Sequence, residues 1–182
     1  MSRVETILCC SLAVLASCAN LERQPALLME GTGSHSLPVT TRVPKAQIYF
    51  DQGLILAYGF NHDESVRSFA EAARLDPACA MAWWGQAYSL GPNMNAGMDE
   101  KRAQKASAAI RRALALAKGA SELEQDLIRA LAVRLEAPVH EDRAVIEAAY
   151  SGAMRALWRN YSDNADVGFL YADALIGETP WE

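Results

Sequence analysis

The chain has 182 residues, 51% hydrophobic and 21% charged, which is the composition of an ordinary globular protein long enough to bury a core. The formal net charge is -5 and the basic residues are interleaved with acids. Nucleic-acid binding is therefore not expected, because it needs clustered Lys and Arg. Three of the four cysteines fall in the first eighteen residues. Cys79 stands alone in the presumed folded part, so no disulfide framework is predicted.

Residues 1–18 have the features of a secretory signal. The apolar run from Ile7 to Ala16 is shorter than the roughly 20 residues that span a bilayer. The segment Leu15-Ala16-Ser17-Cys18 resembles a bacterial lipobox, which implies lipidation of Cys18, and the following Ala19 resembles signals for the outer membrane. The alternative is that the apolar run forms a buried first helix, but no helix-capping signal precedes it.

Residues 19–43 lose hydrophobic periodicity and gain turn formers, including Gly31, Gly33 and Pro38. This composition predicts a flexible tether between the lipid anchor and a helical domain over residues 44–182. The predicted membrane association is through this anchor alone.

The helical domain begins with a pattern of aromatic and small residues. Small residues let two antiparallel helices approach closely, large ones fill the space between them, and a proline ends the second helix. Asn61 with Glu64 predicts a reciprocal cap at the start of that second helix. The residues in this pattern are Tyr49, Gly53, Ser65, Phe69, Ala72 and Pro77.

The pattern recurs after about 34 residues, at Trp83 and Ala87. Its second half recurs seven residues late, at Ala106, Ile110 and Ala113. A loop insertion over residues 91–97, rich in Gly, Pro and Asn, accounts for the delay.

Later residues predict a third pair of helices and half of a fourth. Ser121 with Glu124 forms a capping box before an amphipathic helix, and residues 142–161 and 165–176 predict two more helices. The last helix would expose Phe169, Leu170 and Leu175, so we expect the chain to be a fragment that lacks its closing helix.

From Ala46 to Ala113 the spacing resembles the tetratricopeptide repeat family. The resemblance implies an all-α fold, an antiparallel helix-hairpin solenoid of about three and a half hairpins wound into a superhelix. The runs Tyr49–Leu54 and Phe60–Glu64 are also similar to a group of uncharacterised bacterial exported repeat proteins. Together with the lipobox-like segment and Ala19, it implies an exported, lipid-anchored protein on the outer membrane, facing the periplasm.

Such repeats bind ligands on a concave wall at positions five and nine, which correspond here to Phe50, Leu54, Trp84 and Tyr88. We expect an aromatic groove for an extended peptide. The resemblance thus implies a non-catalytic scaffold with an unknown protein or peptide partner, without cofactor or metal. The alternative is that missing repeats cover these side chains.

A second hypothesis is a copper-linked or catalytic periplasmic protein whose site is completed by residues beyond this chain. The soft or borderline donors are His62, Cys79, Met81, Met94 and Met98, but their spacing fits no metal motif. Asp63 and Glu64 are expected to respond to a helix dipole rather than to act as acid and base. No catalytic motif of known spacing is present, so an enzyme is not expected.

Overall fold

The computed structural model describes residues 25–93, 99–137 and 142–178. These residues form an all-α fold, which confirms the predicted class. The signal, Cys18, Met94 and Met98 lie outside the described residues. The described helices are α2 (Pro44–Tyr58), α3 (His62–Leu75), α4 (Ala80–Leu90), α5 (Glu100–Leu116), the short 3-10 helix η1 (Ala117–Gly119), α6 (Glu122–Leu135), α7 (Arg143–Asn160) and α8 (Ala165–Glu178).

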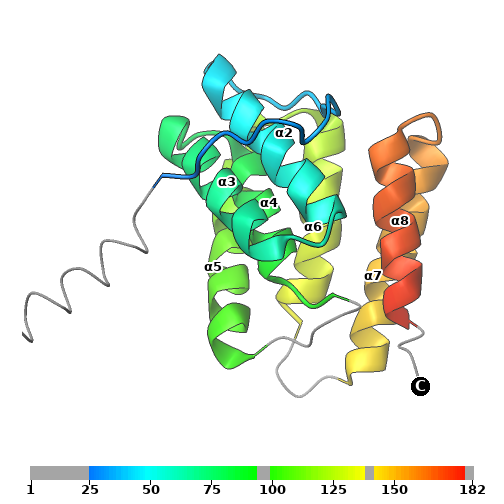
Figure 1. The fold of residues 1–182 in the computed structure, drawn as a ribbon. Coiled ribbons are helices and arrows are strands. Elements are labelled where there is room, and N and C mark those ends of the chain that lie inside the picture. The colour runs from blue at the N-terminus through cyan, green and yellow to red at the C-terminus, as the bar shows by residue number, and fades with distance from the viewer. Residues whose placement is uncertain (1–24, 94–98, 138–141, 179–182) are drawn as a thin grey trace, which may run out of the picture.

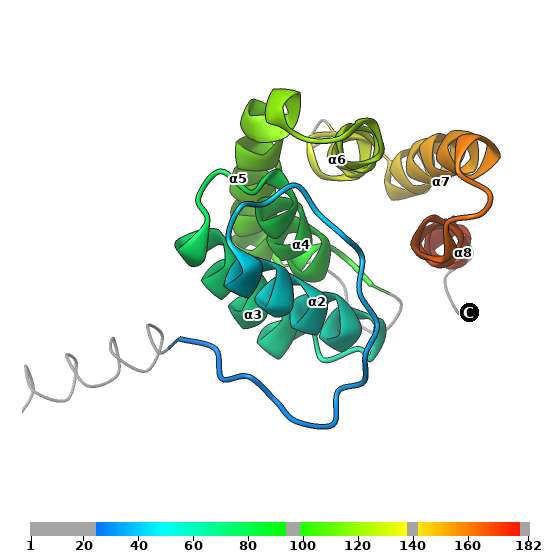
Figure 2. The same ribbon diagram turned by 90° about the horizontal axis from the view of Figure 1, so that it is seen from above.

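Each α-helix packs against the next one along the chain, and α4 also packs against α2 and α6. Short connections make neighbouring helices antiparallel, as between α2 and α3, which three residues join. Seen from above, the helices follow an arc (Figure 2). The arc brings α8 opposite α2 and α4, as the side view also shows (Figure 1).

The ring of Phe69 on α3 holds α2 and α4 together. A Cβ atom placed on Gly53 of α2 would lie 2.9 Å from this ring, and one on Gly85 of α4 would lie 2.4 Å from it. Phe50 meets the same ring at a centroid distance of 5.3 Å. The two glycines therefore provide the space that the phenyl ring occupies.

The residues of the repeat pattern lie mostly in the core. Ser65, one turn before Phe69, donates a hydrogen bond of 2.7 Å to the carbonyl oxygen of Gly53 and contacts the Ser89 hydroxyl at 2.8 Å. Trp83 is half-buried and Pro77 is exposed in the turn after α3. The buried members are Tyr49, Gly53, Ser65, Phe69, Ala72, Ala87, Ala106, Ile110 and Ala113.

The helix starts differ from one another in their capping. Ser121 and Glu124 form the predicted capping box at the start of α6. The reciprocal cap predicted at α3 is wrong, since the side chain of Asn61 makes no capping hydrogen bond. Glu64 instead accepts a hydrogen bond from Arg67, at 2.8 Å, so its carboxylate is turned along the helix.

Residues 25–43, which we call the strap, run along α2 without regular secondary structure apart from a turn (Figure 1). Two glutamine side chains of α2 hold the strap's backbone. Gln52 accepts from the Met29 amide at 2.7 Å and donates to the Leu27 carbonyl at 2.9 Å. Gln47 does the same with the Val39 amide and the Leu37 carbonyl, both at 2.9 Å.

The prediction of a flexible tether is therefore wrong for residues 25–43. Ala26 and Leu37 are buried among the core residues. The Thr40 amide donates to the Glu124 carboxylate at the start of α6, at 2.7 Å. These contacts satisfy backbone groups that a tether would leave to water, and they cover one face of α2.

The close contact at Gly85 predicts the effect of one added methyl group. Gly85→Ala should lower the free energy of unfolding by about 3 kcal/mol, because the new Cβ overlaps the Phe69 ring. Gly152→Ala on α7 is the control, since no atom lies within 4 Å of its added Cβ. It should raise stability by about 0.5–1 kcal/mol through helix propensity. Urea unfolding measures both, and equal effects would contradict the packing role of Gly85.

Candidate functional site

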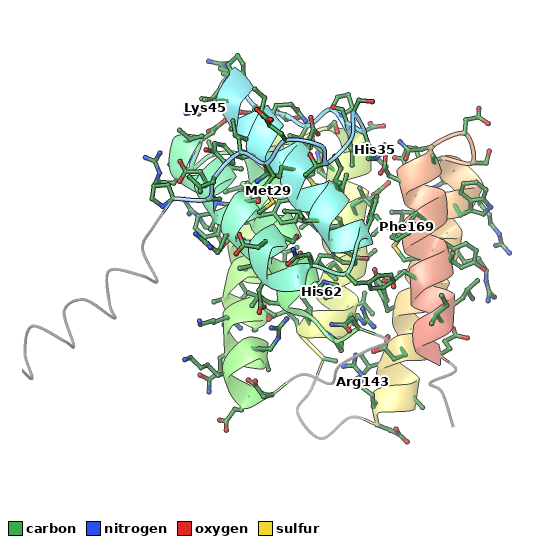
Figure 3. All side chains as sticks on the ribbon, in the orientation of Figure 1. Met29, His35, Lys45, His62, Arg143 and Phe169 are labelled. Carbon is green, nitrogen blue, oxygen red and sulfur yellow. The ribbon has the colours of Figure 1, made fainter. Side chains whose placement is uncertain are left out.

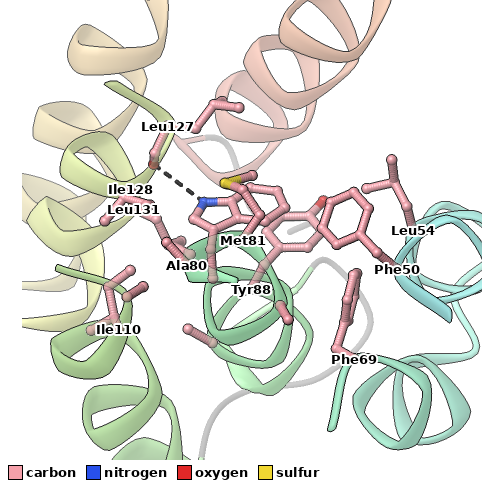
Figure 4. Packing of buried hydrophobic residues seen from close by; sticks show 14 of the residues in the cluster. Phe50, Leu54, Phe69, Ala80, Met81, Tyr88, Ile110, Leu127, Ile128 and Leu131 are labelled. Carbon is pink, nitrogen blue, oxygen red and sulfur yellow. Dashed lines mark hydrogen bonds between the residues drawn. The ribbon is translucent and has the colours of Figure 1, made fainter. Parts of the chain in front are cut away.

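The four residues of the predicted groove are buried side chains of the core. Phe50 and Leu54 lie on α2, and Trp84 and Tyr88 on α4. The Trp84 and Tyr88 rings stack at 5.4 Å with nearly parallel planes. Figure 4 shows Tyr88 among the other buried side chains of the cluster. The indole N–H of Trp84 donates to the Leu127 carbonyl of α6 at 3.2 Å.

The prediction of an open aromatic groove is thus wrong for these residues. The described part of the chain itself covers them, so the burial needs no further repeats. Helix α8 lies on the inner side of the arc, opposite α2, although the two helices are far apart along the chain (Figure 2).

Helix α8 meets the first helices through two aspartates. The Oδ1 atom of Asp166 accepts a hydrogen bond from the Tyr58 hydroxyl at 2.9 Å. The same atom contacts Nε2 of His35 at 2.7 Å. About two helical turns later, Asp173 accepts from the Tyr88 hydroxyl at 3.2 Å. We call this contact region the α8 interface.

An aromatic pair completes the α8 interface. The rings of Tyr58 on α2 and Phe169 on α8 have centroids 3.9 Å apart. His35 of the strap lies on the same side of the molecule as Phe169 (Figure 3). The strap, α2 and α4 therefore all contact α8 through polar and aromatic side chains.

Burial shifts the ionisation of the groups in the α8 interface. The pKa of Asp173 is raised, chiefly by burial, against the lowering effects of Arg134, Tyr88 and His62. The pKa values of Tyr58 and Tyr88 are raised by burial and by the neighbouring aspartates. The tyrosine hydroxyls therefore stay protonated and act as donors.

A buried ion pair lies beside this region. Arg134 of α6 contacts the Glu147 carboxylate of α7 at 2.9 Å, and its guanidinium lies over the Tyr150 ring at 4.9 Å. Arg143 also pairs with Glu147. Both arginines thus compensate the charge of one buried carboxylate, an arrangement that joins α6 to α7.

The soft donors that suggested copper do not share a site among the described residues. Cys79 is buried, and burial raises the pKa of its thiol to about 11, so it stays protonated. Met81 is a core side chain. The described residues contain no cluster of three or more His, Cys, Asp or Glu that could hold a metal ion.

His62, another of the predicted donors, has a different environment from Cys79 and Met81. Both of its ring nitrogens are buried and have no hydrogen-bond partner. Burial and Arg102 lower its pKa, while Asp173 and Asp63 act in the opposite direction. The neighbouring candidate acids are surface groups: Asp63 pairs with Arg102 at 3.3 Å, and Glu64 pairs with Arg67.

Comparison with known protein families, with curated proteins and with solved structures gives no match to this chain. In the described residues, none of the helices combines the length and the apolar character needed to cross a membrane.

Two adjacent tryptophans test whether the predicted groove is core. Trp84→Ala should lower the free energy of unfolding by about 3–5 kcal/mol, because Trp84 is fully buried. Trp83→Ala should cost only about 1 kcal/mol, since Trp83 is half-buried and its N–H reaches the Pro77 carbonyl at 3.3 Å. Thermal and urea unfolding distinguish the two, and a fully stable Trp84→Ala protein would restore the open groove.

The raised pKa of Asp173 predicts a pH dependence of stability. A pKa that is higher in the folded than in the unfolded state adds stability below the unfolded value, and this stability is lost as the pH rises through the folded value. Asp173→Asn keeps an acceptor for Tyr88 but cannot ionise. Relative to this variant, the unaltered protein should lose stability as the pH rises above about 4, the ordinary pKa of an aspartate.

Urea unfolding at several pH values measures this difference, with Asp163→Asn in the exposed turn before α8 as the control. The control should follow the unaltered protein at every pH. A constant offset between Asp173→Asn and the unaltered protein would show that Asp173 titrates as it does in the unfolded chain.

Proposed function

We propose that this chain is an exported, lipid-anchored helical-repeat protein of tetratricopeptide type that holds another protein and catalyses no reaction. The succession of antiparallel helices supports the repeat assignment. The contact of Phe69 with Gly53 supports it further, since two pattern positions on the paired helices of one repeat meet there. The anchor at Cys18 follows from the lipobox-like segment.

The observation that carries the binding role is the outer face of α8. Apart from Glu178 at the helix end, its exposed residues recur at helical spacing and are apolar, which is unusual for a helix face in water. Phe169 is 39% exposed, Leu175 37% and Ile176 41%. The α8 outer face consists of Ala165, Ala172, Leu175 and Ile176, and the exposed part of Phe169, whose ring also packs against Tyr58, borders it.

This surface takes the place of the predicted groove in the proposal. The groove aromatics are occupied by contacts within the chain, whereas the α8 outer face has solvent on it. An apolar helix face of this kind gains free energy when a partner covers it, at roughly 25 cal/mol for each Å² buried. A protein partner can supply an apolar surface large enough to cover the α8 outer face.

The second candidate function, a metal-linked protein, is favoured by one observation, the two unpaired nitrogens of His62. A neutral imidazole with both nitrogens free is a competent metal ligand. Asp173 is an oxygen donor whose electrostatic effect reaches His62. Further ligands would have to come from a partner or from residues outside the described ranges.

Affinity capture from membrane extract separates the two candidates. The tagged full chain should retain a reproducible protein partner, and Ile176→Asp should reduce the retained amount about tenfold, because a charge enters the apolar face. Leu114→Asp on α5, at a residue 38% exposed, is the matched control and should retain the partner. Both variants should melt within a few degrees of the unaltered chain.

Copurified metal without any protein partner would overturn the scaffold and support the second candidate. Equal loss of the partner in both variants would remove the α8 outer face from the proposal.

A further inference from the structure

A cavity of about 370 Å³ opens between the strap and α2. Thr32, Gly33 and Ser34 of the strap line it. Gly31 and Gly33, in the turn of the strap, adopt positive φ values of 79° and 100°, which glycine tolerates without strain. Met29 and His35 lie on either side of this turn, Met29 over α2 and His35 toward α8 (Figure 3). The volume falls within the range of small-molecule sites.

The cavity has an apolar wall. Ile48 and Ile55 of α2 contribute to it from one side, and Leu28 and Met29 of the strap from the other. Ile48 is 50% exposed and Leu28 49% exposed, so the apolar surface continues to the mouth. A ligand with a short hydrocarbon chain would cover this surface and gain free energy by doing so.

The same cavity contains one carboxylate that lacks a cationic partner. Asp51 accepts hydrogen bonds from the Ser36 hydroxyl at 2.8 Å, the Leu37 amide at 3.3 Å and the Gln47 amide at 2.8 Å, all neutral donors. Across the described part of the chain, no lysine or arginine forms an ion pair with it.

His35 does not serve as the cationic partner of Asp51, because its Nε2 atom contacts Asp166 at 2.7 Å. Burial is the largest effect on Asp51 and raises its pKa, while its three hydrogen bonds and the electrostatic effect of His35 lower it. A cation placed beside this carboxylate would offset the cost of its burial. An anionic ligand would be repelled, and a neutral hydrocarbon would leave the charge unpaired.

We propose that the cavity between the strap and α2 binds an alkylammonium ion, with the ammonium group at Asp51 and the hydrocarbon chain along Ile48, Ile55 and Met29. The site lies on α2 and not on the α8 outer face, so the proposal goes beyond the scaffold function and does not depend on it. Binding would also join the strap to α2, because both contribute to the wall.

The probe is n-hexylammonium, titrated into the ¹⁵N-labelled protein and followed by the amide shifts of the strap and α2. We expect saturable shifts confined to these segments, with n-hexanol at least tenfold weaker and hexanoate without effect. This comparison uses the unaltered protein and so needs no variant to fold. Saturation by n-hexanol at the same concentration, or no saturable shift with n-hexylammonium, would overturn the proposal.

Asp51→Asn provides the second comparison, since it keeps the size of the side chain and removes the charge. Affinity for n-hexylammonium should fall at least tenfold, whereas Asp63→Asn, at a side chain 89% exposed on α3, should bind as the unaltered protein does. Unchanged affinity in Asp51→Asn would contradict the assignment of the carboxylate.

An alkylammonium group could come from a free amine or from a lysine side chain of a partner. Nα-acetyl-lysine N-methylamide distinguishes the two sources: binding as tight as that of n-hexylammonium supports a lysine in the site, and weaker binding supports a free amine. Either result supports the cavity as an alkylammonium site.

Discussion

The phenyl ring of Phe69 lies against the backbone of two different helices, and the first two hairpins are arranged around this contact. Gly53 and Gly85 have no side chain where the ring sits, so α2 and α4 can both approach α3 closely. The Ser65 hydroxyl, one turn away, binds the Gly53 carbonyl and the Ser89 hydroxyl, so the approach also satisfies buried polar groups. Trp84 and Tyr88 lie on α4, so the approach of α4 to Phe69 also sets the positions of these two side chains.

Several features of this fold could be predicted because their signals are local. The capping box of Ser121 and Glu124 has a fixed spacing of three, and the small-and-aromatic pattern around Gly53 and Phe69 has a fixed period. Helices α7 and α8 begin and end within two residues of the predicted bounds. In each case the residues that carry the signal belong to the element that it predicts.

The strap and the groove could not be predicted in this way because they depend on contacts distant in sequence. Gln47 and Gln52 look like ordinary polar residues of a helix, yet their amides hold the strap's backbone. The burial of Trp84 and Tyr88 depends on α6 and α8. A signal for the α8 interface did exist: Asp166 and Asp173 stand seven apart in an apolar helix, and so share one face of it.

The contact between His35 and Asp166 joins residues 131 positions apart and brings the last described helix to the first part of the described chain. In an open repeat array each unit touches only its neighbours, so units can be added, removed or folded one at a time. Here α8 contacts the strap, α2 and α4, so the chain gains these contacts only after nearly all of its described length has been synthesised. The two ends of the described helices are therefore joined by side-chain contacts, and deleting an internal hairpin would change the spacing that brings these ends together.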